Sequence, residues 1–259
     1  RQGTQVRKIR LFDNPWDVST DQVLTTVERN IRPETRVLGM TWVHSSSGVK
    51  LPVGEIGELV RRHNRDRSEA ERILYVVDGV HGFGVENVRF ADFNCDYFIA
   101  GTHKWMFGPR GTGIICAAST ALDNLNPLIA TFSEDEDFAT TFTPGGYHAF
   151  EHRWALGAAF DLHLRHGKAA IQARIHGLND YLKQRLETMP GVQLVTPRST
   201  RQSAGFTFFR VADQDADEVA AYLNSQRIVV DAVSRDVGPV VRTAPGLLNT
   251  EAEIDRLIA

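Results

Sequence analysis

The chain has 259 residues, of which 42% are apolar and 24% are charged, and its formal net charge at pH 7 is −3. This length supports one large or two medium domains with a substantial core. The charge gives no basic footprint for nucleic acid or an anionic membrane, and no apolar run is long enough to span a bilayer. Cys95 and Cys116 have neither metal-ligand spacing nor the density of a disulfide scaffold, so both are expected to be small buried apolar residues.

The first 150 residues alternate short apolar runs with helical patterns. Ser19 followed by Gln22 is a helix N-terminal capping signature, and Pro52 suits the first turn of a second helix. The run at 73–77 is continuous in Ile, Leu, Tyr and Val, as in parallel strands that are covered on both faces. Strands are expected at 6–11, 36–43, 73–77, 97–100 and 113–117. Strands separated by helices predict an α/β fold with a mainly parallel sheet.

From residue 151 onward the pattern becomes that of a smaller α+β domain. Helices are expected at 151–166, 168–189 and 216–226, with a last helix from Thr250. Strands are expected at 192–195, 205–211, 228–230 and 240–242. The prediction is therefore a large domain at residues 1–150 and, at residues 151–259, connecting helices with a small C-terminal α+β domain.

Two predicted strands of the large domain end in groups that are costly to leave unpaired. Asp78 follows the apolar run at 73–77, and Lys104 follows the run at 97–100. Ligands of open α/β sheets bind beyond such strand ends. For either motif alone, a plain ion pair between Asp78 and Lys104, or two unrelated loop residues, is the simpler interpretation. Together, they also fit pyridoxal phosphate, which needs an amine for a Schiff base and a carboxylate to keep its ring nitrogen protonated.

An ordered set of motifs resembles the class V aminotransferase family of fold-type I pyridoxal-phosphate enzymes. VVDGVHGFG is followed by GTHKW, whose Lys stands 26 residues after the Asp, and then by GPRGTG. The segments TWVHSSSGVKLPVGEI, FTPGGYHAFEHRWALGAA and VVRTAPGLLNTEAEIDRL stand in the family's order. The resemblance therefore covers nearly the whole chain. The sequence of the GTHKW motif is most similar to that of the isopenicillin-N-epimerase-like branch, which is related to cysteine desulfurases.

The resemblance implies a role for each residue that matches these motifs. Lys104 is implied to form the Schiff base with pyridoxal phosphate and, once released by substrate, to move the proton at Cα. Asp78 is implied to pair with the ring nitrogen of the cofactor. His81 is implied to lie near the phenolic oxygen of the ring.

The remaining matches concern the phosphate and the substrate. His103 and Thr102 are implied to contact the phosphate, and Thr143 matches a residue that reaches the phosphate of the neighbouring subunit in a homodimer with shared active sites. Arg242 is implied to clamp the substrate carboxylate, for which its planar guanidinium is suited. Ser45 matches a position where desulfurases carry an Asn, and the resemblance implies that it lies near the cofactor and substrate.

Several reactions remain open on this framework. Desulfurases need a nucleophilic Cys shortly before the C-terminal Arg, and residues 228–241 contain none. We therefore expect a pyridoxal-phosphate-dependent epimerase or aminotransferase, acting on an amino acid or an amine derived from one through deprotonation at Cα. The alternatives are a C–S or β-elimination lyase with the same cofactor and a catalytically inactive fragment of such an enzyme.

The chain begins at Arg1, without Met, and shows no signal peptide or transit segment. The resemblance implies a long preceding segment that includes a phosphate-binding loop. The sequence is therefore expected to lack the N-terminal part of a cytoplasmic enzyme and to bind the cofactor poorly alone. No metal, nucleic acid or membrane is expected among its partners, which should be a small amino-acid substrate and a second copy of the chain.

Overall fold

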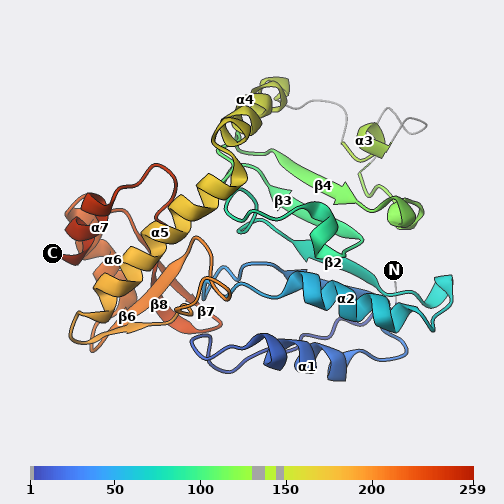
Figure 1. Ribbon diagram of the computed structural model, residues 1–259, viewed down its shortest axis with the longest axis horizontal. Coiled ribbons are helices and arrows are strands. Elements are labelled where there is room, and N and C mark those ends of the chain that lie inside the picture. Colours follow the sequence, from blue (N-terminus) through green and yellow to red (C-terminus); the bar gives the residue numbers. More distant parts are fainter. Residues whose placement is uncertain (1–2, 130–137, 144–148) are drawn as a thin grey trace.

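The computed structural model describes residues 3–129, 138–143 and 149–259, which form two four-stranded sheets joined by long helices (Figure 1). The first sheet has the order β1-β2-β3-β4, in which β1, β2 and β3 are parallel and β4 runs antiparallel to β3. Its strands are β1 (Val37–Thr41), β2 (Leu74–Asp78), β3 (Tyr97–Gly101) and β4 (Gly113–Ala117). The predicted mainly parallel α/β sheet is confirmed.

The two helices predicted before and after β1 are present. Helix α1 (Thr20–Asn30) begins where the Ser19 hydroxyl accepts a hydrogen bond from the backbone N–H of Gln22, at 3.2 Å. Helix α2 (Val53–Asn64) follows Pro52, and the hydroxyl of Tyr75 donates to the Val53 carbonyl at 2.9 Å. Tyr75 therefore ties the middle of the sheet to the first turn of the helix that covers it.

One face of the first sheet is fully covered by described residues, whereas the other is covered only near Tyr97, whose hydroxyl donates to the Ala121 carbonyl at 2.5 Å. Val77 and Phe98 are register partners on the covered face, and both are buried. On the other face Val37, Ile99 and Ile115 are between 44% and 59% exposed. The apolar run at 73–77 predicted a strand covered on both faces. The described residues cover mainly one face of the sheet.

The C-terminal part is a second, fully antiparallel sheet with helices against it. Two long helices connect the sheets, and α5 runs from the edge of the first sheet to the second (Figure 1). The elements are α4 (Phe150–His166), α5 (Lys168–Glu187), β5 (Val192–Leu194), β6 (Thr207–Val211), α6 (Ala216–Ser225), β7 (Asp231–Arg235), β8 (Gly238–Thr243) and α7 (Glu251–Ile258). The strand order is β5-β6-β8-β7. The predicted small α+β unit is confirmed in its architecture.

Shorter elements connect these parts. They are a four-residue helix α3 (Phe138–Thr141) and the 3-10 turns Glu69–Glu71, Phe90–Phe93 and Ser119–Asn124.

Two predicted strands are wrong. Residues 6–11 form no regular structure, because no other described strand pairs with them and Val6 is 86% exposed. Residues 228–230 close helix α6 instead. Arg227 has a positive φ of 61°, and the N–H of Ile228 turns back to the carbonyl of Leu223 at 2.9 Å. The strand therefore starts at Asp231.

The main hydrophobic core runs across the boundary predicted at residue 150. Trp42 and Val77 of the first sheet share one buried cluster with Phe208, Val233 and Val240 of the second. A smaller cluster lies on the opposite side of the second sheet, where α5, α6 and α7 pack. One face of the second sheet is thus directed toward the first sheet, and the division at residue 150 stays a prediction.

A buried lysine joins α5 to the loop before β6. The Lys183 side chain is fully buried, and its Nζ donates to the Pro197 carbonyl at 2.9 Å, the Arg198 carbonyl at 3.5 Å and the Ser203 hydroxyl at 2.7 Å. Three acceptors satisfy its three N–H groups. Because burial disfavours the charged form, the pKa of Lys183 is lowered to about 8.

Substitution Lys183→Met should remove a pH dependence of stability. Between the folded pKa of about 8 and the ordinary value of 10.5, the unfolded chain binds more protons than the folded one. The free energy of unfolding should therefore rise with pH in this window, by up to about 3 kcal/mol from this group. Urea unfolding across the window measures the rise. The exposed control Lys8→Met should keep it, whereas an equal rise in Lys183→Met would contradict the assignment.

Candidate active site

The carboxyl ends of three parallel strands meet at one edge of the first sheet. Asp78, the last residue of β2, pairs in register with Thr41 at the end of β1 and with Ile99 of β3. The carbonyl of Asp78 accepts from the N–H of Trp42, and the N–H of Gly79 donates to Ile99, both at 2.8 Å. The loops that follow β1, β2 and β3 therefore start side by side.

The loop after β2 is folded tightly enough to turn His81 inward. The N–H groups of Gly82 and Phe83 both donate to the carbonyl of Gly79, at 3.0 and 2.9 Å. A Cβ at Gly82 would lie 2.2 Å from the Trp42 ring, so only glycine allows this close approach. His81 is consequently 6% exposed at the floor of the site.

His81 faces Lys104. The two side-chain nitrogens, Nε2 of His81 and Nζ of Lys104, are 3.3 Å apart. Burial, followed by the positive charges of Lys104 and Arg242, lowers the pKa of His81 to about 3, so the imidazole is neutral at physiological pH. Its Nδ1 is buried and has no hydrogen-bond partner among the described residues. Buried polar atoms without a hydrogen-bond partner are rare in native proteins, so this nitrogen is a candidate for contact with a bound group.

Lys104 extends from a compact loop after β3. The N–H of Phe107 donates to the Lys104 carbonyl at 3.1 Å, and Met106 is buried beneath the loop. Partial burial, then the charge of Arg242, lowers the pKa of the Lys104 amine; Asp78 acts in the opposite direction. The amine thus lies within the electrostatic reach of the carboxylate on the neighbouring strand, and the predicted shared role of the two groups stays a prediction.

Arg242 reaches this edge from the second sheet. It lies on β8, opposite Asp231 of β7, and its guanidinium is 5.6 Å from the ring centroid of Phe206. Both Nε and Nη2 donate to Oδ2 of Asp231, the first at 3.2 Å. Nη1 has no hydrogen bond within the described residues. One edge of the guanidinium is therefore held by the protein, and the other is available to a ligand.

The two residues predicted to contact the phosphate, Thr102 and His103, lie in different surroundings. Thr102 is fully buried, and its hydroxyl bonds to that of Thr112, which in turn donates to the Pro109 carbonyl at 2.6 Å. The Thr102 proton is therefore used inside the loop. His103 is exposed on the loop surface. Contacts of Thr102 and His103 with phosphate stay predictions.

Ser45 and Thr143 lie on connecting segments. Ser45 is half-buried in the loop after β1, where His44 bonds through Nδ1 to the Ser47 hydroxyl at 2.8 Å. Thr143 ends the described range 138–143, and its N–H donates to the Thr140 carbonyl at 3.2 Å. The residues that follow it, 144–148, lie outside the described part. The predicted roles of Ser45 and Thr143 are untested by this geometry.

Sequence reasoning missed a buried network behind the site. Both carboxylate oxygens of Glu86 are bonded, one to Nζ of Lys50 at 2.7 Å and the other to Nε2 of His176 at 2.6 Å. Burial raises the pKa of Glu86, but the hydrogen bond from His176 and the charge of Lys50 outweigh it and lower the pKa. The network ties the His81 loop to α5. Its members are 36 and 90 residues from Glu86, so no local pattern signals it.

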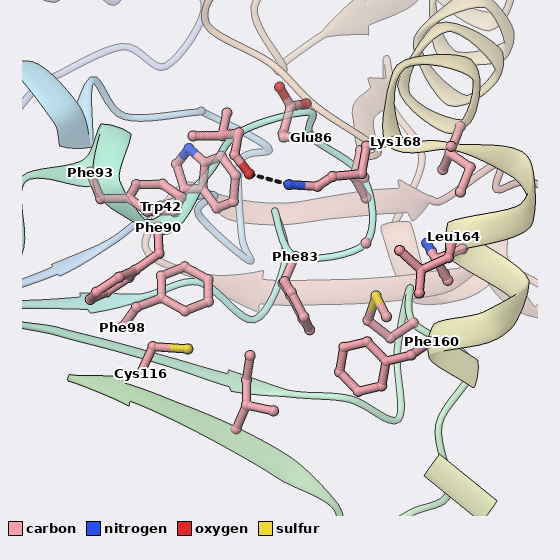
Figure 2. A pocket seen from close by; sticks show the side chains of 18 residues that line it. Trp42, Phe83, Glu86, Phe90, Phe93, Phe98, Cys116, Phe160, Leu164 and Lys168 are labelled. Atoms are coloured by element: carbon pink, nitrogen blue, oxygen red, sulfur yellow. Dashed lines mark hydrogen bonds between the residues drawn. The ribbon is translucent and has the colours of Figure 1, made fainter. Parts of the chain in front are cut away.

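A separate apolar cavity of about 330 Å³ lies between the first sheet and α4 (Figure 2). Trp42, Phe83, Phe98 and Phe160 line it, and Lys168 at its rim donates to the Val88 carbonyl at 2.6 Å. The predicted site residues are not among its lining residues. The cavity is therefore distinct from the candidate active site.

The described part of the chain has neither a metal cluster nor a membrane-spanning helix. It holds no group of three or more His, Cys, Asp or Glu side chains that could bind a metal ion. None of its helices is long and apolar enough to cross a membrane.

Comparison with known proteins assigns the family. The model of the aminotransferase class-V family matches residues 1–257, so the chain belongs to this family, whose members depend on pyridoxal phosphate. The chain is 28% identical over 277 residues to isopenicillin N epimerase of Streptomyces clavuligerus, with 99% of this chain and 67% of that protein covered. It is 24% identical to a probable cysteine desulfurase of Chlamydia trachomatis, covering 98% of this chain and 64% of that protein.

Solved structures share the fold. The apo cysteine desulfurase of Thermococcus onnurineus NA1 matches with a TM-score of 0.80 at 20% identity, over 96% of this chain and 63% of that one. A C-DES mutant with glycine covalently linked to its pyridoxal-phosphate cofactor matches with a TM-score of 0.78 at 23% identity, over 91% and 62% of the two chains. The chain spans about two thirds of the length of the curated relatives it matches.

Opposite charge changes around Lys104 should move its pKa in opposite directions. Arg242→Gln removes a positive charge and should raise the pKa of the amine, whereas Asp78→Asn removes a negative charge and should lower it. The pH dependence of Lys104 acetylation, followed by peptide mass spectrometry, reports this pKa. Arg29→Gln on α1 is the matched control and should leave it unchanged. If neither substitution moves the value, the three groups do not share a site.

Proposed function

We propose that this chain carries the cofactor and substrate site of a pyridoxal-phosphate enzyme that deprotonates Cα of an amino acid, or of an amine derived from one. Epimerisation or transamination, as in isopenicillin-N-epimerase-like proteins, is the proposed outcome. The supporting observation is the convergence of Lys104, His81, Asp78 and Arg242 at one edge of the first sheet.

The side chains at this edge fit pyridoxal phosphate at two ends of its ring. Lys104 supplies an amine with a lowered pKa, and Asp78 supplies an exposed carboxylate from the next strand. The buried Nδ1 of His81, which has no hydrogen-bond partner among the described residues, supports a role of this imidazole in binding a polar group. When bound, the cofactor supplies an electron-withdrawing ring that stabilises negative charge at the substrate Cα.

Each protein group then has a defined task. Lys104 would hold the cofactor through its aldehyde, and the lowered pKa of the amine would increase the neutral fraction available for proton transfer at Cα once Lys104 is released. Asp78 would pair with the protonated ring nitrogen. His81, which is neutral, would offer a ring N–H to the phenolic oxygen. His103, and Thr143 from a second copy of the chain, are proposed to complete the phosphate site.

Arg242 is proposed to bind the substrate carboxylate with its free edge. Asp231 holds the Nε and Nη2 edge, and the Phe206 ring supports the guanidinium plane. This leaves Nη1 and one N–H of Nη2 for a bidentate contact with a carboxylate. A substrate held there presents its Cα toward the edge that carries Lys104, and Ser45 lies on the adjacent loop.

The cysteines argue against the persulfide route of desulfurases. Burial raises the pKa of Cys95 to about 12 and also raises that of Cys116. A thiol with a raised pKa is a poor nucleophile at neutral pH. Because residues 228–241 contain no cysteine, epimerisation or transamination after deprotonation at Cα is the favoured outcome. Product analysis separates both from elimination, because only elimination releases ammonia together with the substituent lost from the substrate side chain.

Covalent attachment to Lys104 is the direct test. The protein is incubated with pyridoxal phosphate and reduced with borohydride, and the modified peptide is identified by mass spectrometry. The wild type and the exposed control Lys8→Ala should carry the reduced cofactor at residue 104, and Lys104→Ala should carry none. Specific attachment at another lysine, or retention in Lys104→Ala, would remove the basis of the proposal.

Asp231 should influence carboxylate binding through Arg242. Asp231→Ala frees the guanidinium, so the dissociation constant of an amino-acid substrate should rise about fivefold, the effect of losing roughly one hydrogen bond. Asp231→Asn keeps an oxygen that accepts from Nε and should recover part of the loss. The kcat of both variants should stay near that of the wild type, and a fall in kcat with unchanged KM would argue against a positioning role.

A further inference from the structure

A second arginine lies on the same face of the β7–β8 hairpin as Arg242. Side chains on a strand alternate between faces, so every second residue of β7 shares a face with its partner on β8. This face carries Asp231 opposite Arg242, Val233 opposite Val240 and Arg235 opposite Gly238. Val233 and Val240 are buried in the core cluster shared with the first sheet. The face that presents Arg242 and Arg235 is therefore directed toward the candidate active site.

The tip of the hairpin is held against the active-site edge. Asp236, next to Arg235, lies 3.4 Å from Nε2 of His44. His44 begins the loop that follows β1 and precedes Ser45 by one residue. This contact places Arg235 beside the loop that borders the proposed substrate position.

Arg235 has no partner of its own within the described residues. Its side chain is exposed and makes no hydrogen bond or ion pair there, whereas Arg242 is paired with Asp231. Its positive charge contributes to lowering the pKa of both Lys104 and His44. Arg235 therefore lies near enough to Lys104 to act on it electrostatically, and its guanidinium can pair with a negatively charged ligand there.

We propose that Arg235 binds a second negative charge on the substrate, so that the site selects amino acids or derived amines with an additional carboxylate. Asp231, which holds Arg242, and Arg235 are four residues apart on β7, about 13 Å along an extended strand. Long side chains at this spacing can bind the two ends of one small molecule. The inference rests on the proposed function, because it takes Arg242 as the site of the first carboxylate.

Binding of two matched ligands tests the proposal without turnover. Glutarate carries two carboxylates, and glutaramate has the same shape with one of them replaced by an amide. Calorimetry on the wild type should show tighter binding of glutarate by about tenfold, the value of one charge-assisted contact. Arg235→Gln should remove this preference and leave glutaramate binding unchanged, Arg235→Lys should restore part of it, and the exposed control Arg29→Gln should keep it.

Other outcomes separate the possible failures. Equal binding of the two ligands by the wild type, or a preference that survives in Arg235→Gln, overturns the role of Arg235. A weaker affinity of Arg235→Gln for pyridoxal phosphate, with the glutarate preference intact, overturns it too, because Arg235 would then serve the cofactor. Absence of cofactor at Lys104 in the borohydride experiment, with the preference present and lost in Arg235→Gln, contradicts the proposed function and supports the anion site.

Discussion

The parallel register of β1, β2 and β3 is the constraint on which the candidate site depends. Because Thr41, Asp78 and Ile99 lie side by side in the ladder, the loops that follow these strands start at one edge. An antiparallel neighbour would send one of the loops to the opposite edge. β4 does run antiparallel, and its residues contribute none of the proposed catalytic or binding groups. The loop that carries Lys104 thus starts beside Asp78 because of backbone pairing.

The second sheet adds a positive charge to this edge of the first sheet. Its hairpin adds Arg242, and the two cations Arg242 and Lys104, together with burial, keep His81 neutral. In turn, the neutral imidazole can lie 3.3 Å from the Lys104 amine without charge repulsion. The common core across the two sheets and the bonds of Glu86 to Lys50 and His176 hold the two halves in this relation. The electrostatics of the site therefore depend on packing far from it.

Much of the fold was predictable, and the exceptions have physical reasons. The capping pair Ser19 and Gln22, the continuous run of β2 and the long patterns of α4 and α5 are local signals, and the structure contains these elements. Residues 6–11 alternate like a strand but have no pairing partner in the described part of the chain. Residues 228–230 are apolar, but they follow the end of α6, where the N–H of Ile228 donates to the carbonyl of Leu223. A strand forms only when a neighbouring strand pairs with it, and local composition does not reveal whether such a neighbour is present.

The candidate site, like the fold, was predictable from the sequence only in part. Sequence alone determined the candidate groups, since Asp78, His81 and Lys104 stand in short motifs that follow predicted strands. Tertiary structure decided how these groups are tuned. The pairing of Arg242 with Asp231, the support of its guanidinium by Phe206 and the position of Arg235 depend on hairpin register and on packing between the sheets. These are contacts between segments distant in the chain, and their geometry is set by the whole core.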